Sequence, residues 1–481
     1  MPRTEPLTAI LPELAPPPDL RVSGLDSDSR RLQEGMLFVG IENRHGDAHR
    51  FLGAAWAAGA GGALLEGFPE SVMTDQGRPV WIRPDARRLL GQGLRRWHAW
   101  DHGKTPAAIG ITGTNGKSSV AWLLAQLAPA PAHLVGTLGY GQPGILEPLP
   151  NTTPEAVTLW ELLDRSRRAG ATTVAMEVSS HALALERVAA IPFDVGIFLN
   201  LSQDHLDFHG DMEHYGQAKA RLFDTPGMHL AILNAEDSLG VALATRLAGK
   251  MEVRSFGFGA GDYRIREYHP GASGTLLVLD TPHGRRQLRS PLLGRSNACN
   301  LLAALACADS LGWSTEDGRI AGLSLPPGRY QRLEPSPGCP QVLVDYAHTP
   351  DALERVLSDL RQVARGRITL VFGCGGERDR GKRPQMGAIA ARLADRVIVT
   401  DDNPRGEDPE RIAGEILSGM PAGTAAVQHD RRSAIRSAIT GAATGDWVLI
   451  AGKGHETFQE TAGHRLPFSD AETAREALQT C

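Results

Sequence analysis

Short apolar runs of strand length alternate with helical segments along the first part of the chain. Residues 37–40 and 62–65 are apolar runs that suit buried strands, and the alanine-rich stretch 54–60 between them predicts a helix. The proline-rich residues 11–18 come before these runs and predict a flexible arm. The pattern therefore predicts a small N-terminal α/β domain over residues 1–103.

A longer alternation follows and predicts a second sheet. Apolar strands with helical segments between them are expected at residues 107–111, 172–176, 193–199 and 229–233. Continuous apolar strands linked by helices indicate a doubly wound, mostly parallel sheet with both faces covered. We assign residues 104–327 to this central domain.

The pattern restarts after the proline- and glycine-rich stretch 325–329, which we interpret as a linker. Apolar strands that each lead into a glycine-rich or charged loop are expected at residues 342–344, 368–372, 397–399 and 447–450. Such loops gather beyond the carboxyl ends of parallel strands, where ligands bind. Residues 328–481 are therefore predicted to form a C-terminal Rossmann-like domain with a cleft for an anionic or zwitterionic ligand.

A glycine turn after the strand at residues 107–111 carries the clearest chemistry. It reads Gly113-Thr114-Asn115-Gly116-Lys117-Ser118-Ser119 and leads into an apolar helix. Glycines let backbone N–H groups surround phosphate oxygens, and a helix N-terminus adds partial positive charge. Lys117 would reach the terminal phosphates, and the Ser118 hydroxyl would bind Mg²⁺.

This turn is two residues shorter than the common P-loop between its first glycine and the Gly-Lys pair. The sequence thus predicts a phosphate loop from outside the common NTPase families. A plain strand-to-helix turn with a surface lysine is the alternative.

Composition narrows the classes of function. The 481 residues carry a net charge of −5, from 50 basic and 55 acidic residues, which argues against nucleic acid as the main partner. No apolar run approaches the roughly 18 residues of a membrane span, and the N-terminus lacks the pattern of a secretory signal. Five cysteines without CxxC spacing indicate a reduced cytosolic protein, and neither a disulfide framework nor a zinc site.

Motifs at the predicted strand ends extend the site beyond the phosphate loop. Residues 176–181 read Met-Glu-Val-Ser-Ser-His, and residues 200–207 read Asn-Leu-Ser-Gln-Asp-His-Leu-Asp. Together with Tyr-Gly-Gln-Ala-Lys-Ala-Arg-Leu-Phe at 215–223 and Asp-Asn-Pro-Arg at 402–405, they closely resemble the Mur ligase family. The resemblance covers almost the whole chain and is strongest to the members that add the third residue of the peptidoglycan precursor.

The resemblance implies an ATP-dependent amide ligase. ATP would phosphorylate the γ-carboxylate of D-Glu in UDP-MurNAc-L-Ala-D-Glu. The amine of meso-2,6-diaminopimelate would attack the acyl phosphate, and ADP and phosphate would be released. Because two anions must meet, cations are needed. Catalytic roles are implied for Lys117, Lys219, Glu177 and His205, with one Mg²⁺ on Ser118 and Glu177 and a second on His205.

Lys219 is implied to be modified. Taken alone, it is a lysine on an amphipathic helix, which is usually a solvated position. In the resembled family the corresponding lysine carries a carbamate derived from CO₂ (N6-carboxylysine). An ammonium repels Mg²⁺, whereas a carbamate offers the oxygen ligands that Mg²⁺ prefers. The resemblance therefore adds carboxylated Lys219 to the metal ligands.

The nucleotide-sugar substrate is expected against the first two domains. The residues that match the family's motifs for it are Ser29, Arg44, His45, Gly46, Asn151, Thr152, Thr153, Ser179 and Arg187. Ser29 and residues 44–46 would bind the uracil and pyrophosphate end, and Arg187 offers a bidentate fork for an anion. A hydrated turn is the alternative for each residue of the first domain singly. The chain departs from a diaminopimelate-adding relative at Leu185, where that relative has a polar residue. This puts one substrate hydrogen bond, but not the reaction, in doubt.

ATP is expected to span two domains. By resemblance its phosphates lie on residues 113–119, and Asn297, Arg329 and Asp345 serve its adenine and ribose. Asn297 would lie near the adenine, and Asp345 could accept hydrogen bonds from ribose hydroxyls. On its sequence context alone, an asparagine after a Gly-Arg turn is usually a helix cap.

The C-terminal domain is implied to choose the amino acid. The residues that match the family's pocket are Arg378, Asp402, Asn403, Pro404, Arg405, Gly452 and Glu456. An arginine fork fits a carboxylate, so Arg405 would bind the distal carboxylate of diaminopimelate, and Glu456 would pair with its distal ammonium. L-Lysine or L-ornithine, the alternative substrates, would leave Arg405 unpaired. A solvated loop tip is the plain alternative for Arg405.

Two other functions stay open. A folylpolyglutamate synthase-like ligase shares the short loop, ATP and amide ligation, but it does not account for residues 402–405 or for the first domain. An ATP-gated binding protein without catalysis would not need Lys117, Glu177, Lys219 and His205 together. We expect a cytoplasmic monomer that acts on small molecules and neither binds nucleic acid nor inserts into a membrane.

Overall fold

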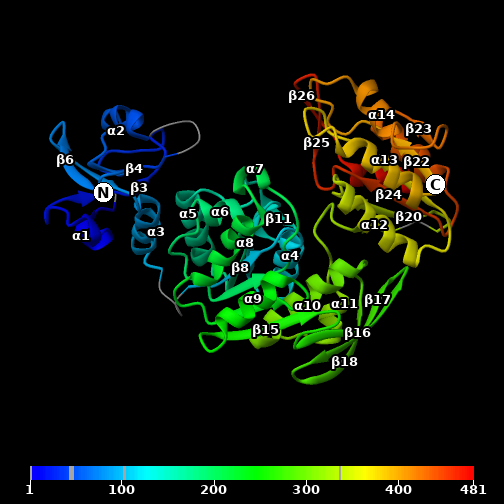
Figure 1. Ribbon diagram of the computed structural model, residues 1–481, viewed down its shortest axis with the longest axis horizontal. Coiled ribbons are helices and arrows are strands. Elements are labelled where there is room, and N and C mark those ends of the chain that lie inside the picture. Colours follow the sequence, from blue (N-terminus) through cyan, green and yellow to red (C-terminus); the bar gives the residue numbers. More distant parts are fainter. Residues whose placement is uncertain (1–2, 43–47, 101–104, 335–336) are drawn as a thin grey trace. The chain divides into compact units, whose positions relative to one another are not determined.

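The computed structural model describes residues 3–42, 48–100, 105–334 and 337–481 (Figure 1). It divides into two compact units. The first contains Met1–Tyr263 and Ala303–Ser314, and the second contains Arg264–Leu302 and Thr315–Cys481. Within the described residues, no helix has the length and apolar character needed to cross a membrane.

The first unit begins with a five-stranded sheet of order β3-β4-β5-β7-β6, in which β6 alone pairs antiparallel. Its strands are β3 (Leu25–Asp26), β4 (Leu37–Gly40), β5 (Gly62–Glu66), β6 (Ser71–Asp75) and β7 (Arg78–Arg83). The strands β1 (Glu5–Pro6) and β2 (Arg21–Val22) form a separate pair. The helical segments are α1 (Leu7–Ile10), η1 (Pro12–Leu14), η2 (Ala48–Phe51), α2 (Leu52–Ala57) and α3 (Ala86–Trp97).

The predicted strands at 37–40 and 62–65 and the helix between them are confirmed, but the flexible arm is wrong. Leu11 and Leu14 are buried in the same core cluster as Leu94 of α3. Pro12 opens the short 3₁₀ turn η1, a position where its missing N–H removes no hydrogen bond. The proline-rich composition therefore gave a wrong prediction, because this segment is packed against the core.

A second, mostly parallel sheet in the first unit carries the phosphate loop. Within this unit its order is β11-β10-β9-β12-β8-β13-β14-β15, and the pairings are parallel from β9 through β15, while β10 and β11 pair antiparallel at one edge. The strands are β8 (Ala107–Thr112), β9 (Ala132–Gly136), β10 (Gly139–Gln142), β11 (Ile145–Glu147), β12 (Thr173–Glu177), β13 (Val195–Phe198), β14 (Leu230–Asn234) and β15 (Glu252–Gly257). The carboxyl ends of β12, β8, β13 and β14 therefore meet at one edge, as the apolar runs predicted.

The helices that accompany this sheet begin at side-chain caps in several places. They are α4 (Lys117–Leu127), α5 (Ala156–Arg168), α6 (Ser180–Ala184), α7 (Leu206–His209), α8 (Met212–Ala220), η3 (Arg221–Asp224) and α9 (Ser238–Leu247). Ser179, Asp211 and Asp237 each accept a backbone N–H at the start of α6, α8 and α9. Such caps satisfy amides that the first helical turn leaves unpaired.

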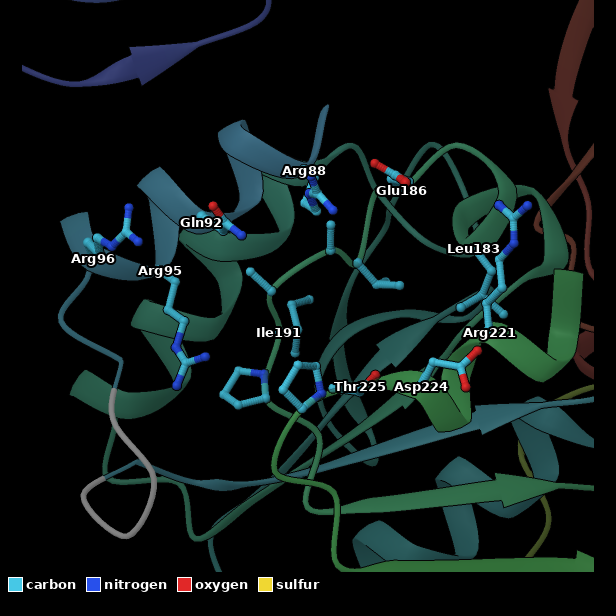
Figure 2. A pocket seen from close by; sticks show the side chains of 15 residues that line it. Arg88, Gln92, Arg95, Arg96, Leu183, Glu186, Ile191, Arg221, Asp224 and Thr225 are labelled. Atoms are coloured by element: carbon cyan, nitrogen blue, oxygen red, sulfur yellow. The ribbon is translucent and has the colours of Figure 1, made fainter. Parts of the chain in front are cut away.

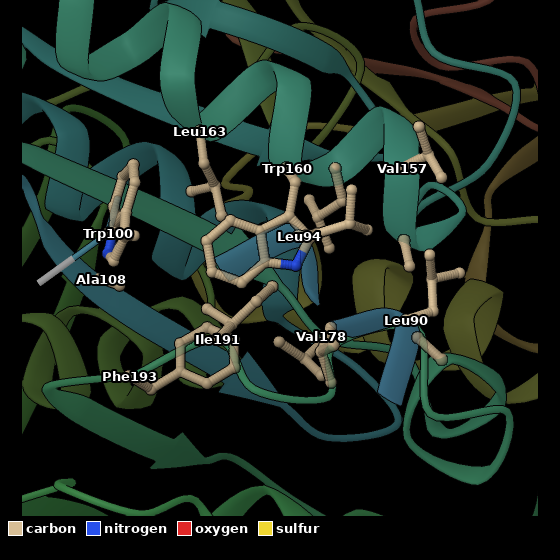
Figure 3. Packing of buried hydrophobic residues seen from close by; sticks show 14 of the residues in the cluster. Leu90, Leu94, Trp100, Ala108, Val157, Trp160, Leu163, Val178, Ile191 and Phe193 are labelled. Carbon is tan, nitrogen blue, oxygen red and sulfur yellow. The ribbon is translucent and has the colours of Figure 1, made fainter. Parts of the chain in front are cut away.

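One hydrophobic core joins the small N-terminal sheet to the central sheet. Figure 3 shows the Trp160 indole of α5 among Leu94 of α3, Ile191 and Trp100. The two tryptophan rings meet edge to face at 6.0 Å. A Cβ on Gly91 of α3 would lie 2.3 Å from the Ala189 carbonyl oxygen, so α3 approaches the segment after α6 as closely as glycine allows. The first sheet is thereby held in place beside the central sheet.

The second unit contains a six-stranded sheet of order β19-β20-β24-β21-β22-β23, parallel except for β19 at its edge. The strands are β19 (Gln331–Leu333), β20 (Gln341–Asp345), β21 (Ile368–Phe372), β22 (Arg396–Val399), β23 (Ala425–Val427) and β24 (Trp447–Ala451). The helices are α12 (Pro350–Val363), α13 (Lys382–Leu393), α14 (Pro409–Leu417), α15 (Arg431–Thr440) and α16 (Asp470–Leu478). A hairpin, β25 (Phe458–Thr461) and β26 (His464–Pro467), follows β24.

Alternate residues of these strands face two cores. Leu343 and Leu449 pack in one cluster with residues of α12, α13 and α14, and Val342 and Val448 pack in the other with residues of α15 and α16. Helices therefore cover both faces of this sheet. An antiparallel meander, β16 (Tyr263–Gly271), β17 (Gly274–Thr281) and β18 (Gly284–Ser290), and the helices α10 (Arg295–Ser310) and α11 (Asp317–Ala321) complete the elements.

The predicted fold class is confirmed. A small α/β sheet, a mostly parallel sheet with a phosphate loop, and a Rossmann-like sheet with two covered faces are all present. The boundaries 1–103, 104–327 and 328–481 stay predictions.

Candidate active site

The phosphate loop lies between β8 and α4, and its glycines adopt backbone conformations that other residues avoid. Gly113 has φ +153° and Gly116, directly before α4, has φ +90°. A Cβ on Gly113 would lie 2.9 Å from the Cβ of Leu199. A side chain there is excluded by contact as well as by backbone strain. The helix at Lys117 thus starts from a tight glycine turn, as anion-binding loops require.

Asn200, the second residue after β13, holds the loop in shape. Its Oδ1 accepts the Asn115 N–H at 2.9 Å, its Nδ2 donates to the Asn115 carbonyl at 3.1 Å, and its own carbonyl accepts the Thr114 N–H at 2.9 Å. The Thr114 hydroxyl lies 3.2 Å from the Tyr215 hydroxyl of α8. The loop is therefore fixed by the neighbouring strand and by the helix that carries Lys219.

Two lysines meet at the Gly113 carbonyl oxygen. Lys117 Nζ donates to it at 2.9 Å and to the Thr114 carbonyl at 3.0 Å, and Lys219 Nζ also donates to it at 2.9 Å. Lys219 is 1% exposed, and its ammonium lies 4.4 Å from the centre of the Tyr215 ring. Burial first, and then the charge of Lys117, lower the pKa of Lys219 to about 6. Near pH 7 Lys219 is therefore largely a neutral amine.

Ser118 and Glu177 form a buried pair beside this loop. The Ser118 hydroxyl donates to Glu177 Oε2 at 2.9 Å, and the Thr137 N–H donates to Oε1 at 2.9 Å. Gly136 lies so close to Glu177 that an added Cβ would meet Oε1 at 2.1 Å. A carboxylate oxygen and a hydroxyl are thus placed together at the end of β12, next to the start of α4.

His205 lies at the start of α7 with a left-handed backbone, φ +53°. Its ring is 3.4 Å from the Asp204 carboxylate and 4.8 Å, centre to centre, from the ring of His181. Burial, with the neighbouring imidazoles, lowers the pKa of His181 to about 4, so that ring is neutral near pH 7. Among the described residues, no group of three or more His, Cys, Asp or Glu side chains is arranged to hold a metal. The metal set predicted for Ser118, Glu177, His205 and Lys219 stays a prediction.

A cavity of about 780 Å³ brings together the two ends of the predicted sugar-nucleotide site. Ser29, in the loop between β3 and β4, lines it together with His181 of α6 and with Leu185 and Arg187, which follow α6. Its lining also contains the arginines and aromatic residues Arg30, Arg50, Arg87, Phe38, Phe51 and Phe208, together with the carboxylates Asp28, Glu42 and Glu155. Arginines and aromatic rings can bind the phosphates and base of a nucleotide, while the carboxylates offset part of the positive charge. Leu185, the departure from the family, contributes an apolar wall. Arg44, His45 and Gly46 lie outside the described residues.

The remaining predicted substrate residues are near the end of β12. The Thr153 hydroxyl donates to the Glu177 carbonyl at 2.8 Å and accepts the Ser179 N–H at 3.1 Å. Arg187 donates to the Thr153 carbonyl at 3.2 Å and pairs with Glu155 at 2.6 Å. Thr153 is buried and braces this turn, while Asn151 is exposed. The Thr152 hydroxyl lies 3.0 Å from that of Thr137.

A second cavity, of about 570 Å³, has none of the predicted site residues among the described residues that line it, although Glu186 and Val188, the sequence neighbours of Arg187, line it (Figure 2). Arg88, Arg95 and Arg96 of α3 line it, together with Arg221, Glu186 and Asp224. With four arginines and two carboxylates, the charge of this lining is mixed with an excess of positive charge.

In the second unit, the residues predicted for adenine and ribose already have partners within the protein. Asn297 is buried and donates to the Leu293 carbonyl at 2.9 Å. Asp345, at the end of β20, accepts the N–H groups of Tyr330 and Ala347 at 2.7 and 2.8 Å, and burial raises its pKa. The Arg329 guanidinium lies 4.6 Å from the centre of the Tyr346 ring.

The residues predicted to choose the amino acid surround the ends of β21, β22 and β24. Arg405 has φ +54°, donates to the Gly376 carbonyl at 2.6 Å and lies 3.7 Å from the Glu460 carboxylate. Asn403 Nδ2 donates to Glu456 Oε2 at 2.8 Å. Arg378, on the loop after β21, is exposed. The arginines and the carboxylate predicted for the distal carboxylate and the distal ammonium of the amino acid are thus all on loops of this unit.

Asp402 and Gly452 fit against each other. Gly452 has φ +118°, and a Cβ there would lie 2.5 Å from Asp402 Oδ2. Asp402 is buried, which raises its pKa, and its Oδ2 has no hydrogen-bond partner among the described residues. Pro404 packs as closely, since a Cβ on Gly376 would meet its carbonyl oxygen at 1.9 Å. Small residues therefore let these loops approach one another.

Five residues that were not assigned from the sequence lie beside the predicted site residues: Asn200, Thr137, Tyr215, Lys453 and Arg383. Asn200 and Tyr215 stand inside the family motifs, so the motifs could have pointed to them. Lys453 stands in a glycine-rich loop, and its complete burial is a tertiary effect. Arg383 is buried with Glu407 at 2.8 Å and donates to the Gly375 carbonyl, bracing the loop of Arg378. Thr137 gave no signal, because its role depends on β9 lying beside β12.

Comparison with known proteins agrees with this geometry. Residues 111–308 match the model of the Mur ligase middle domain, and residues 328–454 match that of the Mur ligase glutamate ligase domain. The UDP-N-acetylmuramoyl-L-alanyl-D-glutamate--2,6-diaminopimelate ligase of Alkalilimnicola ehrlichii is 44% identical over 484 residues, covering 96% of this chain and 95% of the relative. The ligase of the same name from Gloeobacter violaceus is 43% identical, covering 96% and 94%.

A solved structure of a UDP-N-acetylmuramoyl-L-alanyl-D-glutamate--2,6-diaminopimelate ligase has a TM-score of 0.77 and 34% identity over 99% of both chains. The resemblance inferred from the motifs is confirmed, and it extends over both units. This protein therefore belongs to the Mur ligase family.

Proposed function

We propose that this protein is an ADP-forming ligase that joins meso-2,6-diaminopimelate to the γ-carboxylate of D-Glu in UDP-MurNAc-L-Ala-D-Glu. The observation that carries the proposal is its 44% identity, over nearly the whole of both chains, with a relative named for that reaction. The family is ATP-dependent, and the short phosphate loop of this chain suits the phosphates of ATP. The product would be a peptidoglycan precursor, so the enzyme would act in cell wall formation.

The first chemical step converts a poor electrophile into a good one. The bond between the γ-phosphorus and ADP breaks, a new P–O bond forms to the carboxylate, and the carboxylate oxygen becomes part of a leaving group. Lys117 is poised for this step because the carbonyls of Gly113 and Thr114 hold its ammonium at the loop. The charge offsets the repulsion between phosphate and carboxylate. The substrate amine then forms the C–N bond, and phosphate leaves.

Lys219 is proposed to react with CO₂. Burial lowers the pKa of Lys219, and the Lys117 ammonium on the same Gly113 carbonyl lowers it further, so the Lys219 amine is largely neutral near pH 7. A neutral amine attacks CO₂, loses a proton and becomes a carbamate anion. The product attracts Lys117 where the ammonium repelled it. In the active enzyme Lys219 would then present oxygen atoms beside the phosphate loop.

Mg²⁺ is the cofactor that the family implies, and the residues of this chain fit it in part. The Ser118 hydroxyl and Glu177 carboxylate already lie 2.9 Å apart, and Mg²⁺ binds proteins through few side-chain oxygens, with water and phosphate completing its shell. A bound Mg²⁺ would neutralise phosphate charge. A carbamate on Lys219 and the imidazole of His205 are the proposed ligands of a second ion.

The amino-acid pocket supports diaminopimelate over lysine or ornithine. Arg405 and Arg378 could bind the distal carboxylate, and Glu456 beside Asn403 could bind the distal ammonium, with Asp402, Pro404 and Gly452 shaping the loops. Lysine and ornithine have no distal carboxylate, so they would give the arginine fork no partner anion and would place an ammonium group near it, which is unfavourable. Specificity would then rest on the carboxylate.

The test is release of ADP in the presence of ATP, Mg²⁺ and UDP-MurNAc-L-Ala-D-Glu with each candidate amino acid. We expect turnover with meso-diaminopimelate and little with lysine or ornithine. Turnover with lysine alone would overturn the assignment of Arg405. The absence of ADP release with every amino acid would overturn the ligase, and turnover with a folate in place of the nucleotide sugar would favour a folylpolyglutamate synthase.

The same proposal covers the setting of the enzyme. ATP and a nucleotide-linked sugar are cytoplasmic metabolites, so the reaction would take place in the cytoplasm. The two sites would be completed within one chain, which supports a monomer acting on small molecules.

A further inference from the structure

Lys453, in the loop after β24, is completely buried although lysine is rarely so. Its ammonium donates to Asn403 Oδ1 and to Glu456 Oε2, both at 2.9 Å. Lys453 thus contacts two residues that are proposed to line the amino-acid pocket, and it does so from within the protein. A buried cation is retained when its partners satisfy it, and here they are a carboxylate and an amide oxygen.

The two acceptor positions of the Asn403 amide oxygen are both in use. Oδ1 accepts from Lys453 Nζ and from the Glu460 N–H, each at 2.9 Å. If the Asn403 amide were rotated by 180°, its NH₂ group would face the Lys453 ammonium and the Glu460 N–H. Donors would then face donors, with no acceptor between them. Lys453 and the Glu460 backbone therefore decide which way Asn403 points. As a result its Nδ2 faces Glu456 at 2.8 Å.

The Glu456 carboxylate is held by one oxygen. Oε2 accepts from both Lys453 Nζ and Asn403 Nδ2, at 2.9 and 2.8 Å. In the part of the chain that the structure describes, no hydrogen bond uses Oε1. The carboxylate is thus gripped on one side and presents its other oxygen with a fixed direction. An acceptor of this kind is suited to an ammonium group.

We propose that Lys453 is a positioning residue that orients Asn403 and Glu456, so that Glu456 Oε1 receives the distal ammonium of the amino-acid substrate. The inference rests on the proposed function and adds to it the residue that sets recognition of that ammonium. Lys453 already balances the negative charge of Glu456, so net charge alone does not make the pocket select the distal ammonium. The selection comes from the direction in which Lys453 holds the Glu456 carboxylate.

A substrate analogue isolates this interaction. 2-Aminopimelate keeps the reacting amine and the distal carboxylate of diaminopimelate but lacks the distal amino group. The experiment compares kcat/KM for the two amino acids in the wild-type enzyme, Lys453→Met and the exposed-lysine control Lys250→Met. In Lys453→Met we expect the preference for diaminopimelate to fall about tenfold, the loss of one well-placed charged hydrogen bond.

The loss is expected in the KM for diaminopimelate, while the KM values for ATP and the nucleotide sugar stay within about twofold of wild type. A Lys453→Met enzyme that keeps the wild-type preference, or one in which all three KM values rise together, would overturn the inference. Lys250→Met should behave as wild type.

A double-mutant cycle with Glu456→Gln provides the second measurement. If Lys453 acts through Glu456, adding Lys453→Met to Glu456→Gln changes the preference no further. A further drop in the double variant would overturn the proposal. This comparison also serves if Lys453→Met alone does not fold, because the double variant removes both charges together. An inactive wild-type enzyme would instead overturn the proposed function, and the inference with it.

Discussion

Two buried lysines, one in each unit, show how partners decide what a lysine can do. Lys219 is 1% exposed and its ammonium has a backbone carbonyl and a second lysine as neighbours, whereas Lys453 is 0% exposed and has a carboxylate at 2.9 Å. The first has its pKa lowered to about 6 and can react as an amine. The second forms an ion pair and can fix the direction of other groups. Equal burial thus supports covalent chemistry in one place and orientation in the other.

The largest effect is expected from removing the reactive member of this comparison. Lys219→Ala should lower the rate of ADP release by about 1,000-fold or more, because charge stabilisation of several kcal/mol would be lost at the phosphates. Short carboxylic acids added to the variant should restore part of the rate by filling the place of the carbamate. Lys250→Ala, at an exposed position, should keep the wild-type rate. Full activity of Lys219→Ala without any acid would contradict the proposal.

The next test concerns Arg405, the residue of the second unit that is proposed to bind the distal carboxylate of the amino acid. Arg405→Ala should lower kcat/KM for diaminopimelate about 30- to 100-fold, the worth of a charged hydrogen bond of ~2–3 kcal/mol, and should leave the KM for ATP unchanged. Arg411→Ala, which removes an exposed arginine of α14, is the matched control. An equal loss in both variants would show that Arg405 has no special contact with the amino acid.

The pH dependence of the free energy of unfolding should reveal the lowered pKa of Lys219. Its folded value, about 6, lies below the unfolded value of 10.5, so between these values the unfolded chain binds more protons and stability rises with pH. In CO₂-free buffer, wild type should gain about 2 kcal/mol relative to Lys219→Met between pH 7 and 8.5. Urea unfolding at the two pH values measures it. A difference that does not change with pH would mean that Lys219 stays charged in the folded state.

A smaller effect is expected at the proposed metal site of the first unit. Glu177→Gln keeps an acceptor for the Thr137 N–H but removes the charge, and should raise the Mg²⁺ concentration for half-maximal activity about tenfold. A Mg²⁺ titration of ADP release measures this change. If the titration curves of variant and wild type coincide, Glu177 does not hold the ion.

The sequence was most informative where local pattern decides structure. Apolar runs predicted the strands that end at Thr112 and Glu177, and glycine spacing predicted the phosphate loop. The sequence did not predict contacts that depend on the order of the strands. Asn200 reaches the phosphate loop only because β13 pairs with β8, and Thr137 reaches Glu177 only because β9 pairs with β12. The proline-rich start misled because burial of Leu11 is decided by the distant helix α3.

Lys453 shows the same limit in the second unit. Its sequence context, a lysine between two glycines, is typical of an exposed loop. Its burial follows from the close approach of three loops after β22, β24 and β21, which glycines at 376 and 452 allow. No local pattern reports such an approach, so a motif could name Glu456 and Asn403 without the residue that orients them.

The most direct test of the comparison is carbon NMR of the enzyme in ¹³C-labelled bicarbonate. The account predicts a protein-bound carbamate signal in wild type and in Lys453→Met, and its loss in a folded Lys219→Ala variant. The absence of that signal from active wild-type enzyme, or its persistence in Lys219→Ala, would contradict the assignment of Lys219 as the reactive lysine.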